Sequence, residues 1–325
     1  MDPVHVLILA LLQGVAELFP VSSLGHTIII PGLLGWNETL HSPQFLPLVV
    51  TLHLGTAVAL LTFFWRDWVD LLRGGMRVLI AGKFTPDVDP QGHGRQLALV
   101  VIGTIPAGLI GVLFQKPLEA LFANPLPVSL FLFANGFVLL TAERLYRVQQ
   151  AKAAALVPLS SSGTLAFQPG AASDAVPITA KRNAVTPSGE VGLSISDMTF
   201  LQALLIGSSQ IFALLPGFSR SGLTIAAGMS NKLSHEAAAR FSFLLATPII
   251  FAAGVLEIPT LFGDKNALVL ALAGGVLAGI SAYLSVRFLM RYFETNRLDP
   301  FAYYCMAAGA LSFGYFLLRS MKVLP

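Results

Sequence analysis

Six long apolar stretches constrain this chain of 325 residues more than any other feature. A helix needs about 20 mostly apolar residues to cross the hydrocarbon core of a bilayer. Charged residues make up only 11% of the chain, whereas soluble domains carry about 25%. We therefore predict an all-α polytopic membrane protein, with residues 1–325 forming a single integral membrane domain. The predicted spans are residues 44–65, 97–115, 126–143, 235–256, 267–290 and 300–319.

Two other apolar segments, residues 6–35 and 198–230, are long enough to span but are interrupted near their middles. Proline, glycine and serine cluster at the interruptions, residues 20–25 and 216–222. Each segment is predicted to form a helix, a break and a second helix. Irregular backbone at membrane depth is tolerated only where protein or a wet cavity surrounds it, because unpaired peptide groups are costly in lipid. Both breaks are therefore predicted to line a cavity.

The basic residues predict the orientation. Of the 20 Lys and Arg residues, fifteen fall in loops on one side of the predicted spans, and Arg220 alone lies inside an apolar span. Loops rich in Lys and Arg stay in the cytoplasm. This distribution requires each broken segment to enter and leave on one face, the first from outside and the second from the cytoplasm. The outer set of loops holds only Lys116, Lys265, Arg319 and Lys322.

The two broken segments also resemble one another. "LLQGVAELFPVSSLGHTI" and "GSSQIFALLPGFSRSGLTI" share Gln, then Pro, then Ser, Gly and Thr-Ile at nearly matching offsets. Together with entry from opposite faces, this similarity predicts an inverted-topology repeat whose interrupted helices meet near the midplane. We expect about ten helices, including two broken re-entrant pairs.

Residues 149–196 are rich in Ser, Gly, Ala and Pro and lack apolar periodicity, which predicts a flexible cytoplasmic linker. A single cysteine, Cys305, allows no internal disulfide. The chain has no basic run with interleaved aromatic residues, so we expect no nucleic-acid partner. Membrane lipids are the expected surroundings.

Three ionisable residues fall inside the broken apolar segments: Glu17, His26 and Arg220. Each such group costs about 2.5 to 3.5 kcal/mol on insertion scales and usually faces a cavity or a partner. A purely structural alternative is a Glu17–Arg220 ion pair that pins the two breaks together. A lone buried histidine is more often a packing residue, but the neighbouring carboxylate and serines favour a functional role for His26.

The second break carries the more specific signal, "PGFSRSGLT". Clustered hydroxyls surround Arg220, whose planar guanidinium suits phosphate oxygens. A helix is predicted to begin at this point, and its N-terminal N–H groups favour an anion. Gly217 allows close backbone approach. The pattern predicts a phosphate or diphosphate cradle with hydroxyl donors from Ser219, Ser221 and Thr224.

Two polar residues elsewhere have ambiguous roles. Gln13 lies one helical turn before Glu17 and shares its face, either as a ligand or as a polar neighbour. His53 either lines the cavity or is a packing residue, and its isolation in an apolar span favours packing.

The two motifs together resemble a known family. "QGVAELFPVSSLGH" is similar to its (E/Q)-x-x-x-E region followed by P-V-S-S-x-G-H, and "LLPGFSRSGLT" matches its P-G-x-S-R-S-x-x-T motif. This is the family of bacterial undecaprenyl-pyrophosphate phosphatases, also known for bacitracin resistance. The resemblance covers nearly the whole chain apart from residues 149–196.

The resemblance implies a multi-pass inner-membrane enzyme of interlocked inverted repeats whose site opens to the periplasmic side. It would remove the terminal phosphate of undecaprenyl diphosphate, a polyprenyl diphosphate lipid, and so recycle the carrier for cell-wall synthesis. A transporter or flippase of a lipid phosphate or another anion is the alternative, since broken helices in inverted repeats are also a transporter architecture. The oligomeric state is left open between a monomer and a homodimer.

Carried over by position, the resemblance implies catalytic roles for Glu17, His26 and Arg220, supported by Ser22, Ser23, Ser219, Ser221 and Thr224. Gln13 departs from the glutamate that many members have there. Glu17 either orients His26 or binds a divalent cation, Mg²⁺ or Ca²⁺. The nucleophile is Ser23, His26 or water, with the resemblance favouring the serine.

Overall fold

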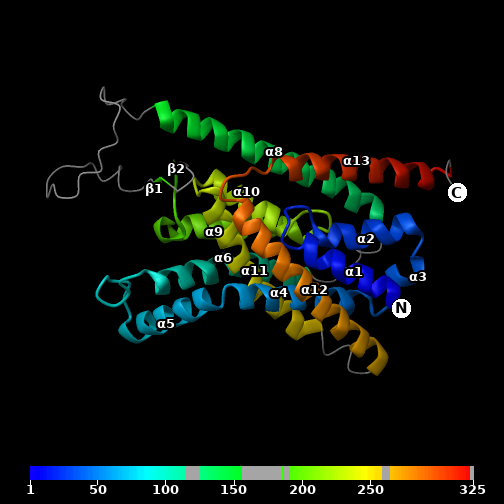
Figure 1. Ribbon diagram of the computed structural model, residues 1–325, viewed down its shortest axis with the longest axis horizontal. Coiled ribbons are helices and arrows are strands. Elements are labelled where there is room, and N and C mark those ends of the chain that lie inside the picture. Colours follow the sequence, from blue (N-terminus) through cyan, green and yellow to red (C-terminus); the bar gives the residue numbers. More distant parts are fainter. Residues whose placement is uncertain (115–123, 156–183, 186–190, 258–263, 323–325) are drawn as a thin grey trace.

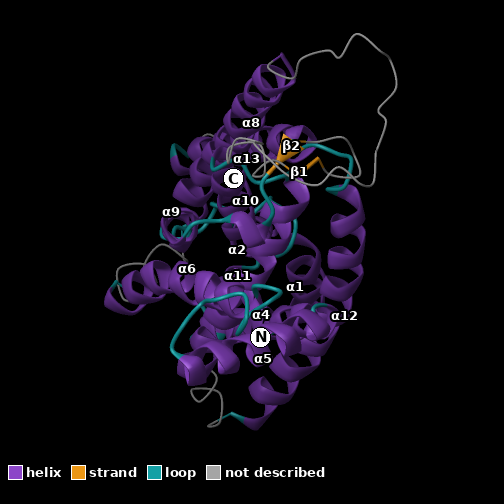
Figure 2. Cartoon of the chain, turned by 90° about the vertical axis from the view of Figure 1, so that its left-hand side faces the viewer, coloured by secondary structure: helices purple, strands orange, loops and turns teal. Residues whose placement is uncertain are grey.

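The computed structural model describes residues 1–114, 124–155, 184–185, 191–257 and 264–322. These residues form twelve α-helices, short 3₁₀ turns and one two-residue antiparallel ladder, β1 (Ala184–Val185) with β2 (Val191–Gly192) (Figures 1 and 2). The predicted all-helical class is thus confirmed. The helices are α1 (Pro3–Ala16), α2 (Ser23–Leu34), α3 (Asn37–Leu40), α4 (Phe45–Phe63), α5 (Trp65–Ala81), α6 (His93–Leu113), α8 (Pro125–Ala155), α9 (Phe200–Ser209), α10 (Arg220–Ser230), α11 (His235–Glu257), α12 (Lys265–Tyr292) and α13 (Asp299–Ser320).

Six of these helices are long and apolar enough to cross a membrane: α4, α6, α8, α11, α12 and α13. They coincide with the six stretches predicted from the sequence. Their length and composition are those of a multi-pass membrane protein.

Both broken segments form a helix, an irregular stretch and a second helix, as predicted. The first is α1 followed by α2, and the second is α9 followed by the 3₁₀ turn η3 (Phe212–Leu214) and α10. Each second helix starts with the same cap. The Ser22 hydroxyl accepts from the Gly25 amide at 3.1 Å, and the Ser219 hydroxyl accepts from the Gly222 amide at 3.0 Å. These caps pair amides that a helix start otherwise leaves without partners.

The backbone of the breaks has a positive φ at two positions. Ser22 has a φ of 67°, which is uncommon for a residue with a side chain. Gly217 has a φ of 110°, and a Cβ there would also overlap the Val128 carbonyl of α8. Glycine is therefore required at position 217, because only glycine fits both the backbone angle and the space.

Small residues let the helices approach closely. In Figure 1, α8 runs beside α13, while α1 and α4 pack on α12 and α9 packs on α6. A Cβ added to Gly14 would overlap the Ala278 carbonyl of α12, and one added to Gly207 would overlap the Gly103 carbonyl of α6. Such close backbone approach provides the van der Waals packing that holds membrane helices together.

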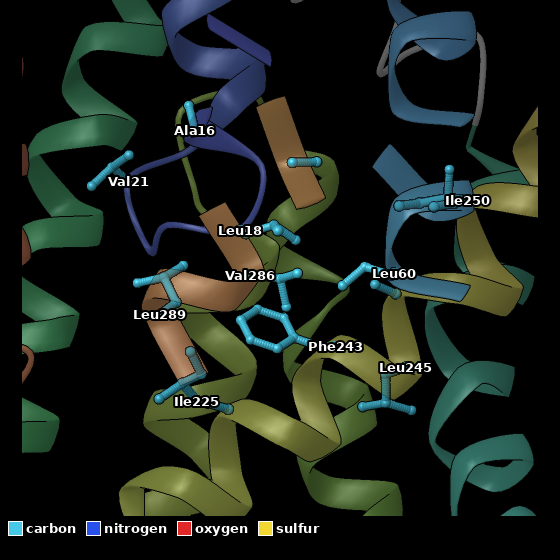
Figure 3. Close-up of a cluster of buried hydrophobic side chains, with 14 of the residues drawn as sticks. Ala16, Leu18, Val21, Leu60, Ile225, Phe243, Leu245, Ile250, Val286 and Leu289 are labelled. Carbon is cyan, nitrogen blue, oxygen red and sulfur yellow. The ribbon is translucent and has the colours of Figure 1, made fainter. Parts of the chain in front are cut away.

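A buried apolar cluster lies beside the breaks. Leu18 of the first break, Leu60 of α4, Ile225 of α10 and Val286 of α12 lie around Phe243 of α11 (Figure 3). All five side chains are fully buried. This packing places the irregular backbone at a fixed position among α4, α10, α11 and α12.

Buried hydrogen bonds to Glu143 hold α8 against its neighbours. The Glu143 carboxylate accepts from His235 Nε2 of α11 at 2.9 Å and from the Leu298 amide before α13 at 3.1 Å. It thereby joins three helices through charge-assisted hydrogen bonds.

The predicted linker, residues 149–196, has fixed ends. Helix α8 continues to Ala155, and Ile195–Asp197 form a 3₁₀ turn, η2. The Arg95 Nη1 group donates to the Ser196 carbonyl at 2.7 Å. Residues 156–183 and 186–190 lie outside the described residues, so flexibility and cytoplasmic placement stay predictions for that part.

We predict that Gly207→Leu destabilises the protein while Gly314→Leu does not. The leucine at position 207 would force α9 away from α6, at a cost of about 1–3 kcal/mol or more. Gly314 is the matched control, because a Cβ there meets no atom within 4 Å. Thermal unfolding and size-exclusion profiles in detergent measure the effect, and equal profiles for the two variants would contradict the α6–α9 contact.

Candidate active site

The two breaks meet. A Cβ on Gly25 would lie 3.1 Å from the Gly217 Cα, and one on Gly222 would lie 3.2 Å from the Pro20 carbonyl. The Ser221 hydroxyl donates to the Phe19 carbonyl at 3.2 Å. Residues about two hundred positions apart therefore form one site.

Glu17 lies at the centre of this site. Its Oε1 accepts from Arg220 Nη2 at 2.8 Å, while its Oε2 accepts from Ser23 Oγ at 2.5 Å and from Gln13 Nε2 at 2.9 Å. The Glu17 side chain is only 5% exposed and that of Arg220 only 14%. The ion pair considered from the sequence is thus present, and it lies in a site that also holds the predicted serine.

The structure also places His53 in this site, where the sequence favoured a packing role over a cavity-lining one. Its Nε2 lies 3.1 Å from Glu17 Oε2, and its Nδ1 lies 2.7 Å from the Val49 carbonyl. The sequence around a single histidine in an apolar span does not reveal that a carboxylate from another helix lies beside it.

Asn135 of α8 was also not predicted, and it joins the two breaks directly. Its Nδ2 donates to the Pro20 carbonyl at 3.0 Å, and its Oδ1 accepts from the Ser219 amide at 3.0 Å. Both peptide groups belong to irregular backbone, so Asn135 replaces hydrogen bonds that a continuous helix would have made.

Arg220 begins α10 and is held from two sides. Besides the bond to Glu17, its Nη1 donates to the Ser242 carbonyl of α11 at 3.3 Å. Thr224 Oγ1 contacts Ser242 Oγ at 2.6 Å, and Ser221 Oγ lies 3.1 Å from Ser219 Oγ. The hydroxyls of Ser221 and Thr224 thus form hydrogen bonds within the protein, and these bonds hold α10 in place.

His26 faces away from this cluster. Its Nδ1 donates to the Ser22 carbonyl at 2.6 Å, and its Nε2 lies 2.7 Å from the Tyr304 hydroxyl of α13, on which the ring stacks. Ser23 Oγ instead donates to Glu17. The structure places His26 and Ser23 on consecutive turns of α2 with different partners, and the catalytic role of His26 stays a prediction.

A cavity of about 320 Å³ opens beside the cluster. Its polar lining comes from Glu17, Ser22, Ser23, His53, Gln210, Ser219 and Arg220. The remaining lining is apolar or glycine, including Gly108 and Gly111 of α6 and Ala252 and Ala253 of α11. Of the other predicted site residues, Gln13, His26, Gly217, Ser221 and Thr224 lie outside this lining.

Comparison with known proteins identifies the family. Residues 6–311 match the family model described as bacitracin resistance protein BacA. The chain belongs to this family. The resemblance noted from the two motifs is therefore confirmed over nearly the whole length.

Similar proteins cover the same length. The chain is 44% identical over 316 residues to "Undecaprenyl-diphosphatase 2" of Burkholderia lata, covering 97% of each chain. It is 43% identical to the protein of the same name in Burkholderia orbicola, again over 97% of each. The protein of that name in Chromobacterium violaceum is 42% identical over 317 residues, which are 96% of this chain and 98% of that one.

The divalent cation suggested from the sequence stays a prediction. Gln13 Oε1 is buried and has no hydrogen-bond partner within the described part of the chain. Carboxylate and amide oxygens are the ligands that Mg²⁺ and Ca²⁺ prefer. The described ranges hold no group of three or more His, Cys, Asp and Glu side chains placed to bind a metal ion.

We predict that Asn135→Ala lowers the thermal unfolding midpoint in detergent. The substitution leaves the Pro20 carbonyl and the Ser219 amide unpaired in a buried place, at about 1–3 kcal/mol each. Asn296→Ala, in an exposed turn, is the control. Equal unfolding midpoints for the two variants would contradict the bridging role of Asn135.

Proposed function

We propose that this protein hydrolyses undecaprenyl diphosphate to undecaprenyl phosphate and inorganic phosphate, and thereby recycles the lipid carrier for cell-wall synthesis. The observation that supports this most is the cavity. Its wall joins one polar group of side chains, around Glu17 and Arg220, to an otherwise apolar lining. A diphosphate with an isoprenoid tail likewise has a polar head and an apolar chain. Relatives that match over nearly the full length are named undecaprenyl-diphosphatase.

Arg220 and the start of α10 bind the diphosphate in this proposal. The guanidinium has five N–H donors, and its bonds to Glu17 and Ser242 leave others for phosphate oxygens. The positive end of α10 adds a second attraction for an anion. Ser219 and Ser22 also line the cavity and cap the two helix starts.

Ser23 is the nucleophile that the geometry favours. It lines the cavity, and its hydroxyl donates to Glu17 Oε2 at 2.5 Å. Ser23 Oγ forms a bond to the terminal phosphorus while the bond from that phosphorus to the bridging oxygen breaks, and the hydroxyl proton passes to Glu17. Undecaprenyl phosphate leaves. The oxygen of a water molecule then bonds to the phosphorus of the phosphoserine, the bond from phosphorus to Ser23 Oγ breaks, and Glu17 returns its proton to Oγ as inorganic phosphate leaves.

His26 supports this site indirectly in our proposal. Its hydrogen bond to the Ser22 carbonyl holds the residue next to the nucleophile in its strained conformation. A divalent cation on Glu17 would neutralise part of the phosphate charge when bound.

We also propose that the two breaks are re-entrant and belong to an inverted repeat, with the site open to the periplasmic side of the inner membrane. The equivalent serine caps support this arrangement. The packing supports it as well. If α1 corresponds to α9 and α12 to α6, the contact of α1 with α12 has its counterpart in that of α9 with α6.

Phosphate release from undecaprenyl diphosphate by purified protein in detergent tests the function. Wild type is expected to turn over, and Arg220→Lys and Ser23→Ala to lose about 100-fold or more, because removal of one transition-state donor costs about 10²–10³. Arg291→Lys, at an exposed position on α12, is the control. EDTA should lower the rate and added Mg²⁺ or Ca²⁺ restore it.

A folded wild type that binds the lipid without releasing phosphate would contradict the proposed hydrolysis. Near-normal turnover by Arg220→Lys would contradict the phosphate cradle, because a lysine supplies a point charge rather than a planar fork.

We predict that Gly108→Phe selectively impairs the long-chain substrate. Gly108 lines the cavity, and a Cβ there meets no atom within 4 Å, so the aromatic ring would fill space that the tail needs. The KM for undecaprenyl diphosphate should rise about tenfold, which corresponds to about 1.4 kcal/mol of binding free energy. A prenyl diphosphate of five carbons should be hydrolysed as by wild type.

Gly314→Phe on α13 is the matched control, since Gly314 also has open space but does not line the cavity. Equal effects of Gly108→Phe on the long and the short substrate would contradict the assignment of the apolar lining to the tail.

A further inference from the structure

We infer that His53 is a positioning residue that holds the Glu17 carboxylate in the orientation needed to take the proton of Ser23. This inference rests on the proposed phosphatase function. Neither the motifs nor the family match points to position 53, which lies on α4, outside both breaks.

The first observation is the orientation of the imidazole ring. Its Nδ1 lies 2.7 Å from the carbonyl of Val49, one turn earlier on α4, and a carbonyl oxygen only accepts. Nδ1 therefore carries a hydrogen, and this bond sets the direction in which Nε2 points. Nε2 lies 3.1 Å from Glu17 Oε2, and because an ionised carboxylate oxygen also only accepts, Nε2 carries a hydrogen as well and His53 donates to Glu17 as the imidazolium.

The second observation is which carboxylate oxygen His53 contacts. Oε2 is the atom that accepts from Ser23 Oγ, whereas Oε1 accepts from Arg220 Nη2. The end of a glutamate side chain rotates over a broad energy well, so it needs external donors to fix its plane. His53 on α4 donates to one carboxylate oxygen and Arg220 on α10 donates to the other. Together they fix the carboxylate plane so that Oε2 points toward Ser23.

The third observation separates this role from packing. The His53 side chain is 20% exposed and lines the cavity, whereas the Glu17 side chain is only 5% exposed. A packing histidine would be enclosed by apolar neighbours. His53 instead presents an edge to the space in which the diphosphate would lie, and a small molecule can reach the position that its ring occupies.

The test compares His53→Ala and His53→Gln in undecaprenyl diphosphate turnover. We expect His53→Ala to lower kcat about 100-fold with KM nearly unchanged, because a misplaced reacting group costs about that much. Glutamine offers an N–H donor and should retain most of the rate. Added imidazole should restore His53→Ala, but not Ser23→Ala. His93→Leu, at the start of α6, is the control for loss of a histidine elsewhere.

The outcomes separate the role of His53 from the phosphatase function itself. Wild-type kcat in His53→Ala would overturn the inference while leaving the phosphatase function intact. Equal loss in the Ala and Gln variants without imidazole rescue would also overturn it, because the ring would then act by packing. Absence of turnover in folded wild type would overturn the function together with this inference. If His53→Ala does not fold, the kcat of His53→Gln decides, and a loss as large as that of Ser23→Ala overturns the donor role.

Discussion

The ion pair between Glu17 and Arg220 is the interaction on which the rest of this structure depends. Each of these charges alone would cost about 2.5 to 3.5 kcal/mol in the membrane interior. At 2.8 Å they compensate one another, but only if the end of α1 and the start of α10 stay together. Removing one partner of a buried pair typically costs about 3–5 kcal/mol, because the other charge is left uncompensated. The surrounding helices must therefore hold both breaks in place.

Holding the breaks also requires partners for their peptide groups. An interrupted helix leaves amides and carbonyls unpaired, and lipid offers them nothing. The protein solves this problem with side chains: Ser22 and Ser219 cap the second helices, while Asn135 pairs Pro20 with Ser219. The same residues that make the site irregular enough to bind a ligand thus make it stable. The tie at Glu143 keeps α8, and hence Asn135, in register with α11 and α13.

The sequence predicted the six spans because apolar length alone decides which helices can cross a bilayer. It predicted both breaks because Pro20 and Gly217 interrupt helices locally. It did not predict the roles of Asn135 and His53, since a single polar residue in an apolar span has no periodic signal and its partner comes from another helix. Thr224 shows a further limit: a helical hydroxyl often bonds a carbonyl of the preceding turn, as Thr224 does with Arg220, and composition cannot distinguish this from a ligand.

The charge balance of the site follows from Gln13. With glutamine beside it at position 13, Glu17 is the one carboxylate among the described residues that line the cavity, and it is paired with Arg220 and His53. A diphosphate entering the cavity therefore meets no second negative charge, and the amides at the start of α10 and the remaining guanidinium N–H groups attract it. A single carboxylate must then take the proton of Ser23 without help from a neighbour, so its orientation matters more than in a site with two. The donors that converge on Glu17 from α1, α4 and α10 supply that orientation.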